Sequence, residues 1–415
     1  MSEKNDNVNL DDNEENKNES SDEINLTDLP LEIFLYICSF LDASTLVHRL
    51  SLVCKQFWYI LKEDSMWKRK IHNVWPNSRY PILPPDRDEE LFWKLACVAV
   101  ERQAYLWRNM ENIKSFPLEE GHYGCVDGLL LMNEGRLCIS GGRDRLLVCW
   151  KLDTYVDKQK IQTYTGFGHD GWIRDITSLH GKIYSCSWDQ RIHVWSVENT
   201  GIEPIHRMAL YRDSTSALLC ITSNEQTNLI ATGSYCKTIS VLDPRLSDPL
   251  VARYQPHQRA VLKITMNSQY IISGSEDRTV SIWDQRSQRT LESITVSTDS
   301  FPMSLCMYRR SVFIGDSGAY IHVLDTDNYK IVKQYKTEHT KGITGIYASL
   351  GSIITSSLDS TVRISSPTDP PKQFTILKSP HGDIAGMDYL NDVLAVCGDS
   401  ALQIWRPKCN TYNIL

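Results

Sequence analysis

Serine, histidine and aspartate recur together along this chain, and these residue types form the nucleophilic triads of hydrolases. Three sets stand out, each followed by a tryptophan: His122, Ser140, Asp144 and Trp150; His169, Ser185, Asp189 and Trp195; His257, Ser273, Asp277 and Trp283. A catalytic triad needs a single activated serine beside an oxyanion hole, whereas this set repeats. Repetition favours a structural hydrogen-bond network that satisfies buried polar groups. We therefore predict no catalytic residue and no enzyme activity.

Other patterns that carry chemistry are missing from the sequence. No GxxxxGK[ST] phosphate-binding loop occurs, no histidines are paired at metal-ligand spacing, and no two of the 12 cysteines form a CxxC motif. We expect no cofactor, no metal and no disulfide framework. Free thiols suit a reducing compartment, so we expect an intracellular protein, cytoplasmic and/or nuclear.

Charge is concentrated at one end of the 415 residues. Residues 1–24 hold nine Asp or Glu against two Lys, which accounts for the whole formal net charge of -7. We predict that they form a disordered acidic tail. The remaining chain is near neutral and lacks the basic footprint of a nucleic-acid binder, and no apolar run is long enough to span a bilayer. We expect neither nucleic acid nor a membrane as a partner.

The three sets above belong to an internal repeat. Equivalent positions fall at residues 150, 195, 242, 283, 324, 365 and 405, so the seven units recur every 40 to 47 residues. Within each unit, apolar residues alternate between Gly, Ser and Asp turns, which is typical of short strands. A His lies upstream of the Trp in the best units, as in Gly121-His122 and Gly168-His169.

This period and the His/Trp pairing resemble the WD repeat, whose units form four-stranded propeller blades. The resemblance covers about residues 113–415 and implies a closed seven-bladed β-propeller. Residues 115–120 would then supply the outer strand of the last blade, so truncating 113–120 or 400–415 should open the ring. Units three and five have Cys236 and Gly318 where the others have Asp. We expect strand pairing and packing to hold these two blades, which makes them the first to open locally.

Residues 25–71 read as short helices. Thr27 or Asp28 could cap the first, with Pro30 in its first turn; the second would begin after Asp42 and the third near Leu50. The order LPLEI, FLD, LSLVCKQFWYIL and DSMW resembles an F-box. That resemblance implies docking on the Skp adaptor, and through it on a cullin-RING ubiquitin ligase. The matched positions are Leu29, Pro30, Ile33, Leu41, Leu46, Leu52, Val53, Cys54, Trp58 and Trp67. Some of these must form the core of the bundle itself, Trp58 and Trp67 in part. For adaptor contact we predict Leu29, Pro30, Ile33, Leu41, Leu46, Leu52, Val53 and Trp58.

Residues 72–112 should form a helical linker. Positions 88–111 predict an amphipathic helix that turns one face toward a neighbour and acts as a rigid stalk. That face would consist of Leu91, Phe92, Leu95, Ala99 and Leu106. Pro81, Pro84 and Pro85 before it indicate a turn.

The resemblance also implies two positions per blade that face one rim of the propeller. Related F-box/WD receptors place arginines there to hold a phosphorylated segment. Here these positions include Asp127, Arg143, Arg174, Trp188, Tyr235 and Glu276, and with Trp172, which lies beside the two arginines, they form the rim set. With only two arginines and two opposing acids, it favours a peptide with an apolar or aromatic anchor and at most one acidic group. The alternative is that Arg143 and Arg174 pair with Asp127 or Glu276 in solvent.

The sequence therefore predicts a mainly β protein with a small α domain: a seven-bladed WD-repeat propeller preceded by a helical F-box and a helical stalk. The resemblance to F-box/WD-repeat receptors implies the substrate-recognition subunit of an SCF-type (Skp-cullin-F-box) ubiquitin ligase, acting on an unidentified protein. The alternative is a propeller scaffold that assembles a complex without driving ubiquitylation.

Overall fold

A computed structural model describes residues 26–83, 85, 91–154, 161–198, 201–209 and 216–408. The predicted acidic tail, residues 1–24, lies outside them. The chain divides into two compact units, with the boundary between Leu61 and Lys62. Among the described residues, no helix has both the length and the apolar character to cross a bilayer.

The first unit is a small helical bundle. It contains η1 (Leu26–Asp28), α1 (Leu31–Phe40), α2 (Ala43–His48), η2 (Leu50–Leu52) and α3 (Lys55–Lys62). Phe34 and Phe57 stack at 4.5 Å between ring centroids and form its centre. The predicted start of the second helix is confirmed, because the Asp42 carboxylate accepts a hydrogen bond from the Thr45 N–H at 2.7 Å.

The other two helix starts differ from the prediction. Thr27 and Asp28 lie in the turn η1 and do not cap α1, whose N-cap is Pro30. A short 3-10 turn, η2, occupies the position near Leu50, and the third α-helix begins only at Lys55.

The second unit begins with two helices, α4 (Asp64–Val74) and α5 (Phe92–Arg108). α4 carries the DSMW motif, so the predicted range 25–71 extends across the boundary between the two units. Trp67 on α4 is fully buried. Lys70 of α4 forms an ion pair with Glu101 of α5 at 3.2 Å.

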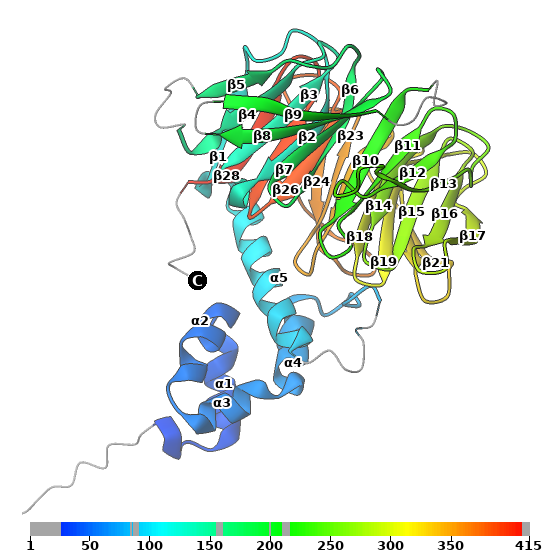
Figure 1. Cartoon of the computed structure of the whole chain (residues 1–415). Helices are drawn as coiled ribbons and strands as arrows, with labels where there is room; N and C mark the ends of the chain where they lie inside the picture. Colours follow the sequence, from blue (N-terminus) through cyan, green and yellow to red (C-terminus); the bar gives the residue numbers. More distant parts are fainter. Residues whose placement is uncertain are drawn as a thin grey trace, which may run out of the picture. The chain divides into compact units, whose positions relative to one another are not determined.

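The rest of the second unit consists of seven four-stranded antiparallel sheets (Figure 1). The short turns η3 (Met110–Asn112), η4 (Asn133–Gly135) and η5 (Leu152–Thr154) join some of these elements. Blade one consists of β2 (Val126–Met132), β3 (Leu137–Gly142), β4 (Leu147–Lys151) and β5 (Thr163–Gly166). Blade two consists of β6 (Ile173–Leu179), β7 (Lys182–Ser187), β8 (Arg191–Glu198) and β9 (Gly201–Ala209). Blade three consists of β10 (Leu218–Asn224), β11 (Leu229–Ser234), β12 (Ile239–Leu242) and β13 (Leu250–Tyr254). Blade four consists of β14 (Val261–Met266), β15 (Tyr270–Ser275), β16 (Thr279–Asp284) and β17 (Arg289–Thr295). Blade five consists of β18 (Pro302–Tyr308), β19 (Ser311–Asp316), β20 (Tyr320–Asp325) and β21 (Lys330–Lys336). Blade six consists of β22 (Ile343–Ala348), β23 (Ile353–Ser357), β24 (Thr361–Ser365) and β25 (Gln373–Lys378).

Both ends of the propeller domain meet in the seventh blade, as predicted. It combines β26 (Gly386–Leu390), β27 (Val393–Cys397) and β28 (Leu402–Pro407) with β1 (Ile113–Leu118). β1 pairs with β28 in a continuous register from Ile113 opposite Pro407 to Leu118 opposite Leu402. β26 also packs against β2, so the ring of blades is closed.

Carboxylates on innermost strands link neighbouring blades. Asp388 of blade seven accepts a hydrogen bond from the Leu131 N–H of blade one at 2.6 Å, and burial raises its pKa. Asp175 of blade two accepts from the Ile221 N–H of blade three at 3.2 Å and from the Lys263 ammonium of blade four at 2.8 Å. These contacts add polar ties to the apolar packing between blades.

Helix α5 packs against blades six and seven. Trp107 donates to Gln103 at 2.8 Å, and Gln103 donates to the Tyr389 hydroxyl at 2.8 Å. The buried face of α5 consists of Phe92, Ala96, Cys97, Val100, Gln103, Ala104, Leu106 and Trp107. Phe92 and Leu106 were predicted correctly, but Leu91 and Leu95 are exposed and Ala99 is only half-buried. The true face lies about one residue further along the helix, because its small side chains allow a close approach to the blades.

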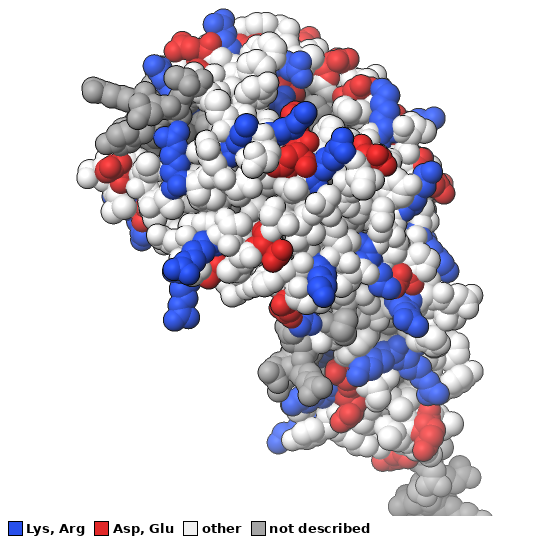
Figure 2. Space-filling model, turned by 90° about the vertical axis from the view of Figure 1, so that its right-hand side faces the viewer, with Lys and Arg blue, Asp and Glu red and all other residues white. Residues whose placement is uncertain are grey.

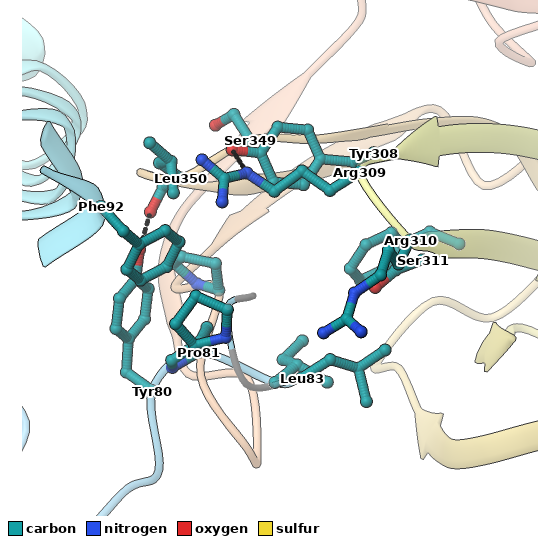
Figure 3. A pocket seen from close by; sticks show the side chains of 14 residues that line it. Tyr80, Pro81, Leu83, Phe92, Tyr308, Arg309, Arg310, Ser311, Ser349 and Leu350 are labelled. Atoms are coloured by element: carbon teal, nitrogen blue, oxygen red, sulfur yellow. Dashed lines mark hydrogen bonds between the residues drawn. The ribbon is translucent and has the colours of Figure 1, made fainter. Parts of the chain in front are cut away.

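The proline-containing segment before α5 also docks on the propeller. Arg79 and Asp369 exchange backbone hydrogen bonds, and the Tyr80 hydroxyl donates to the Leu350 carbonyl at 3.1 Å. Figure 3 shows Tyr80, Pro81 and Leu83 around a small apolar pocket that also includes Tyr308 and Arg309 of blade five. The segment does more than form the predicted turn, because it ties α4 and α5 to blades five and six.

Candidate functional site

The repeated Ser/His/Asp sets form buried networks in the blades. In blade one, His122 Nδ1 lies 2.9 Å from Asp144 Oδ2, and His122 Nε2 lies 2.8 Å from Ser140 Oγ. The Trp150 indole N–H donates to the same Ser140 oxygen at 2.8 Å. Because the serine oxygen is held between imidazole and indole, this geometry supports the structural interpretation over a nucleophilic one.

Blades two, four and six repeat this geometry with variations. In blade two, His169 lies 2.7 Å from both Asp189 and Ser185, and Trp195 donates to Ser185 at 2.8 Å. Blade four keeps the contacts of His257 with Asp277 at 3.1 Å and Ser273 at 2.8 Å, while Trp283 stacks on Tyr254. In blade six, His339 contacts Asp359 and Thr355.

The protonation of these groups follows from burial and hydrogen bonding. Burial alone would raise the pKa of Asp189, but hydrogen bonds from His169 and from two backbone N–H groups lower it to about 2. Burial lowers the pKa of His257 and of His339, against the opposing effect of Asp277 and Asp359. Asp189 is therefore stabilised as an anion, and His257 and His339 are stabilised as neutral imidazoles.

Blade five contains a network that the sequence analysis missed. Asp316 is fully buried and accepts from His322 Nε2 at 2.9 Å, from the Tyr320 N–H at 2.7 Å and from the Ser300 hydroxyl. The expectation that strand pairing and packing mostly hold this blade did not include this buried network. The signal was present in the sequence. Asp316, two residues before Gly318, takes the place of the usual Asp, and His322, six residues after Asp316, takes the place of the usual upstream His.

One group of side chains has the composition of a metal site. His169, Asp189 and His193 bring potential ligand atoms within 4.8 Å of one another. Both nitrogens of His169 are already hydrogen-bonded within blade two, and the two imidazole rings stack at 3.8 Å between centroids. These contacts indicate that the three side chains pack as part of blade two.

The predicted rim set is partly brought together at blades one and two. Asp127 accepts from Arg143 Nε at 2.9 Å and from Arg143 Nη2 at 3.3 Å. The same carboxylate forms an ion pair with Arg174 Nη1 at 2.9 Å. The Asp127 side chain is only 6% exposed, against 41% for Arg143 and 31% for Arg174. The pairing of both arginines with Asp127, stated above as the alternative, is therefore present.

Aromatic side chains lie beside this ion-pair cluster. The Arg143 guanidinium lies over the Trp172 ring at 5.2 Å from its centroid, and Trp172 contacts Trp188 at 4.5 Å between centroids. Tyr235 is exposed on the turn between β11 and β12, and Glu276 is half-buried on the turn between β15 and β16. No described contact joins Tyr235 or Glu276 to the cluster.

Two further aromatic residues on this rim were not predicted. Tyr123 follows the blade histidine His122 directly and is 77% exposed; Phe167 precedes Gly168 and is 69% exposed. Both lie in loops that connect an outer strand to the innermost strand of the next blade, on the same rim as Trp172. On the face of the molecule shown in Figure 2, acidic and basic side chains are interspersed.

The helical bundle exposes an unusual number of large apolar side chains. Of the residues predicted for adaptor contact, Pro30, Ile33, Leu52, Val53 and Trp58 are exposed, and Leu29 and Leu41 are half-buried. Leu46 is fully buried, so it is a core residue and not an available contact. On α1 and α3, four exposed large apolar residues were not in the prediction: Leu31, Tyr36, Phe40 and Tyr59. We call these four, together with Ile33, Leu52, Val53 and Trp58, the exposed apolar set.

Comparisons with known proteins agree with this architecture. Residues 26–72 match the F-box-like family, and residues 158–196 and 249–284 match the WD domain, G-beta repeat family. The chain is 30% identical over 391 residues to human F-box/WD repeat-containing protein 9, covering 92% of this chain and 82% of the relative. It is 24% identical over 324 residues to F-box/WD repeat-containing protein mec-15 of Caenorhabditis elegans, covering 75% of this chain and 77% of the relative. The segments HYGCVDGLLL, HDGWIRDITSL and CVAVERQAYLW had predicted a resemblance to F-box/WD-repeat-containing protein nine, which is confirmed.

Proposed function

The chain belongs to the F-box/WD-repeat family, and from that premise we propose that it is the substrate-recognition subunit of an SCF-type E3 ubiquitin ligase. In this proposal the F-box binds the Skp adaptor, and the adaptor links the chain to a cullin-RING ligase. The propeller rim holds the protein that becomes ubiquitylated.

The exposed apolar set carries the proposal. A water-soluble bundle this small gains by burying such side chains, and large exposed apolar surfaces mark interaction sites. Leu52, Val53 and Trp58 are 74%, 67% and 44% exposed. Aromatic and aliphatic anchors of this kind contribute ~2 kcal/mol or more each when a partner buries them.

The mechanism is one of positioning. A receptor that binds adaptor and substrate together raises the effective concentration of the substrate near the ubiquitin-charged enzyme. Such a subunit needs no catalytic residue, and the Ser/His/Asp sets serve the blades. The free thiols of the eleven described cysteines fit an intracellular site of action, in the cytoplasm, the nucleus or both.

The test is a pull-down from cells of the intact chain and of a Leu52→Ala/Val53→Ala double variant. Both side chains are exposed, so their truncation leaves the core of the bundle unchanged. We expect the intact chain to capture the adaptor and cullin and the variant to lose both. Lys55→Ala/Lys62→Ala, which changes two exposed lysines of α3, is the matched control and should behave as the intact chain.

Two results would contradict the proposal. If the intact chain captures the adaptor without a cullin, it is a scaffold that does not drive ubiquitylation. If the intact chain and the variants all fail to capture the adaptor, the F-box does not function in docking.

A further inference from the structure

The rim of blades one to three carries a distinctive combination of side chains. Among the described residues of the propeller, every large aromatic side chain on the exposed surface lies on this rim: Tyr123, Phe167, Trp172, Trp188 and Tyr235. They come from loops or turns of three consecutive blades. The ion-pair cluster of Asp127, Arg143 and Arg174 lies among them.

The charge of the cluster is set by Asp127. Two guanidinium groups share one carboxylate, which leaves a net charge of one positive unit. The hydrogen bond to Asp127 raises the pKa of Arg143, so that guanidinium stays charged. A ligand with one negative charge neutralises the cluster, whereas a phosphate monoester carries about -1.5 to -2 at neutral pH.

The hydrogen-bond geometry of the two arginines also favours a ligand with one negative charge over a phosphate monoester. An arginine grips phosphate with two parallel N–H groups, and the Nε and Nη2 groups of Arg143 already donate to Asp127. Arg174 Nη1 is engaged by the same carboxylate, and Arg174 Nε is buried. The N–H groups that remain lie beside the negative charge of Asp127, which repels a phosphate with nearly two negative charges more strongly than a carboxylate with one.

We propose that Asp127 is a specificity-determining residue that excludes phosphorylated segments, and that this rim binds an unphosphorylated peptide with an aromatic side chain next to one Asp or Glu. The aromatic residues lie on both sides of the cluster, from Tyr123 in the loop before blade one to Tyr235 in blade three. This inference rests on the proposed function, since it names the class of segment that the receptor holds.

The experiment compares three capped dipeptides that differ in one side chain: acetyl-Phe-Asp-amide, acetyl-Phe-Asn-amide and acetyl-Phe-phosphoserine-amide. Binding to the full chain is followed by the fluorine resonances of 5-fluorotryptophan at Trp172 and Trp188, assigned by single substitutions to Phe. We expect the Asp peptide to bind about tenfold more tightly than the Asn peptide, the difference made by one hydrogen bond to a charged group. It should also bind more tightly than the phosphoserine peptide.

The Asp127→Asn variant should reverse this preference, because it frees both arginines and raises the charge of the cluster. Asp170→Asn, which changes a 75% exposed aspartate on the same rim, is the matched control and should keep the wild-type order. Should Asp127→Asn fail to fold, Arg174→Gln gives an independent test. It makes the cluster neutral and should remove the advantage of the Asp peptide over the Asn peptide.

Three outcomes would overturn the inference: tighter binding of the phosphoserine peptide to the wild type, an unchanged order in Asp127→Asn, or no response of Trp172 and Trp188 to any peptide. None of them depends on the adaptor. The pull-down described above therefore fails or succeeds independently of this experiment.

Discussion

At the scale of single residues, the blade histidines contribute a pH dependence to stability. Burial lowers the pKa of His257 and of His339 below the ordinary value of 6.5. The unfolded chain therefore binds more protons than the folded chain once the pH falls below about 6.5. This contribution to stability is fully present above that pH and is lost as the pH falls toward the lowered pKa values.

We expect the free energy of unfolding to decrease between pH 7 and pH 5, and to decrease less in a His257→Gln/His339→Gln double variant. Urea denaturation at several pH values measures how steeply the free energy of unfolding changes with pH in the wild type and in the double variant. A double variant with the wild-type slope would show that these two histidines do not titrate on unfolding.

Asp316 offers a second test at this scale. Asp316→Asn weakens a buried carboxylate network with His322, Ser300 and the backbone of β20, and we expect a loss of about 3 kcal/mol of stability. Asp325→Asn, which changes a less buried aspartate at the end of β20, should cost much less. Equal losses in the two variants would contradict a specific role for Asp316.

At the scale of elements, the contact of α5 with the propeller depends on one glycine. A Cβ atom at Gly351 would lie 2.5 Å from the Ala99 carbonyl oxygen, and backbone cannot yield as a flexible side chain can. Gly351→Ala should therefore displace α5 and cost about 1–3 kcal/mol.

Denaturation of Gly351→Ala beside Gly201→Ala checks this expectation. A Cβ at Gly201 has only an ordinary contact of 3.8 Å with Tyr164. If Gly351→Ala is as stable as the Gly201 variant, α5 is not held closely against this loop.

At the scale of the whole molecule, closure of the ring depends on the pairing of β1 with β28. Removing residues 402–415 deletes β28 and leaves β1 and β27 without their shared partner. Open strand edges promote association, so we expect this truncation to be protease-sensitive and to self-associate. Size-exclusion chromatography with light scattering measures the second effect.

Removal of residues 409–415 alone is the matched control, because it leaves β28 intact. We expect that variant to resist proteolysis as the full chain does. A stable, monomeric product lacking 402–415 would show that the ring does not need this closure.

The repeat spacing by itself determined the number of units, and the resemblance of these units to WD repeats implied four-stranded blades, their strand order and a closed ring. Each blade is a local unit of about forty residues, so its strands, turns and Ser/His/Asp/Trp network are encoded within one period. The pairing of residues 115–118 with the last blade also followed, because a ring of seven such units must close. In the F-box region the start of α2 after Asp42 was predicted correctly, whereas the cap of α1 was misassigned and α3 begins at Lys55 instead of near Leu50.

Only the tertiary structure decided which side chains meet across units of the repeat. It is the helix packing that buries Leu46 while leaving Leu52 exposed, and the approach of α5 to Gly351 sets which face of that helix is buried. Asp316 and His322 stand at shifted positions in the repeat, and the structure shows that these two side chains meet and replace the usual Asp/His pair. The sequence placed Asp127, Arg143 and Arg174 on one rim but left open whether the arginines pair with Asp127, with Glu276 or with a ligand; only the packing of blades one and two decided that both pair with Asp127.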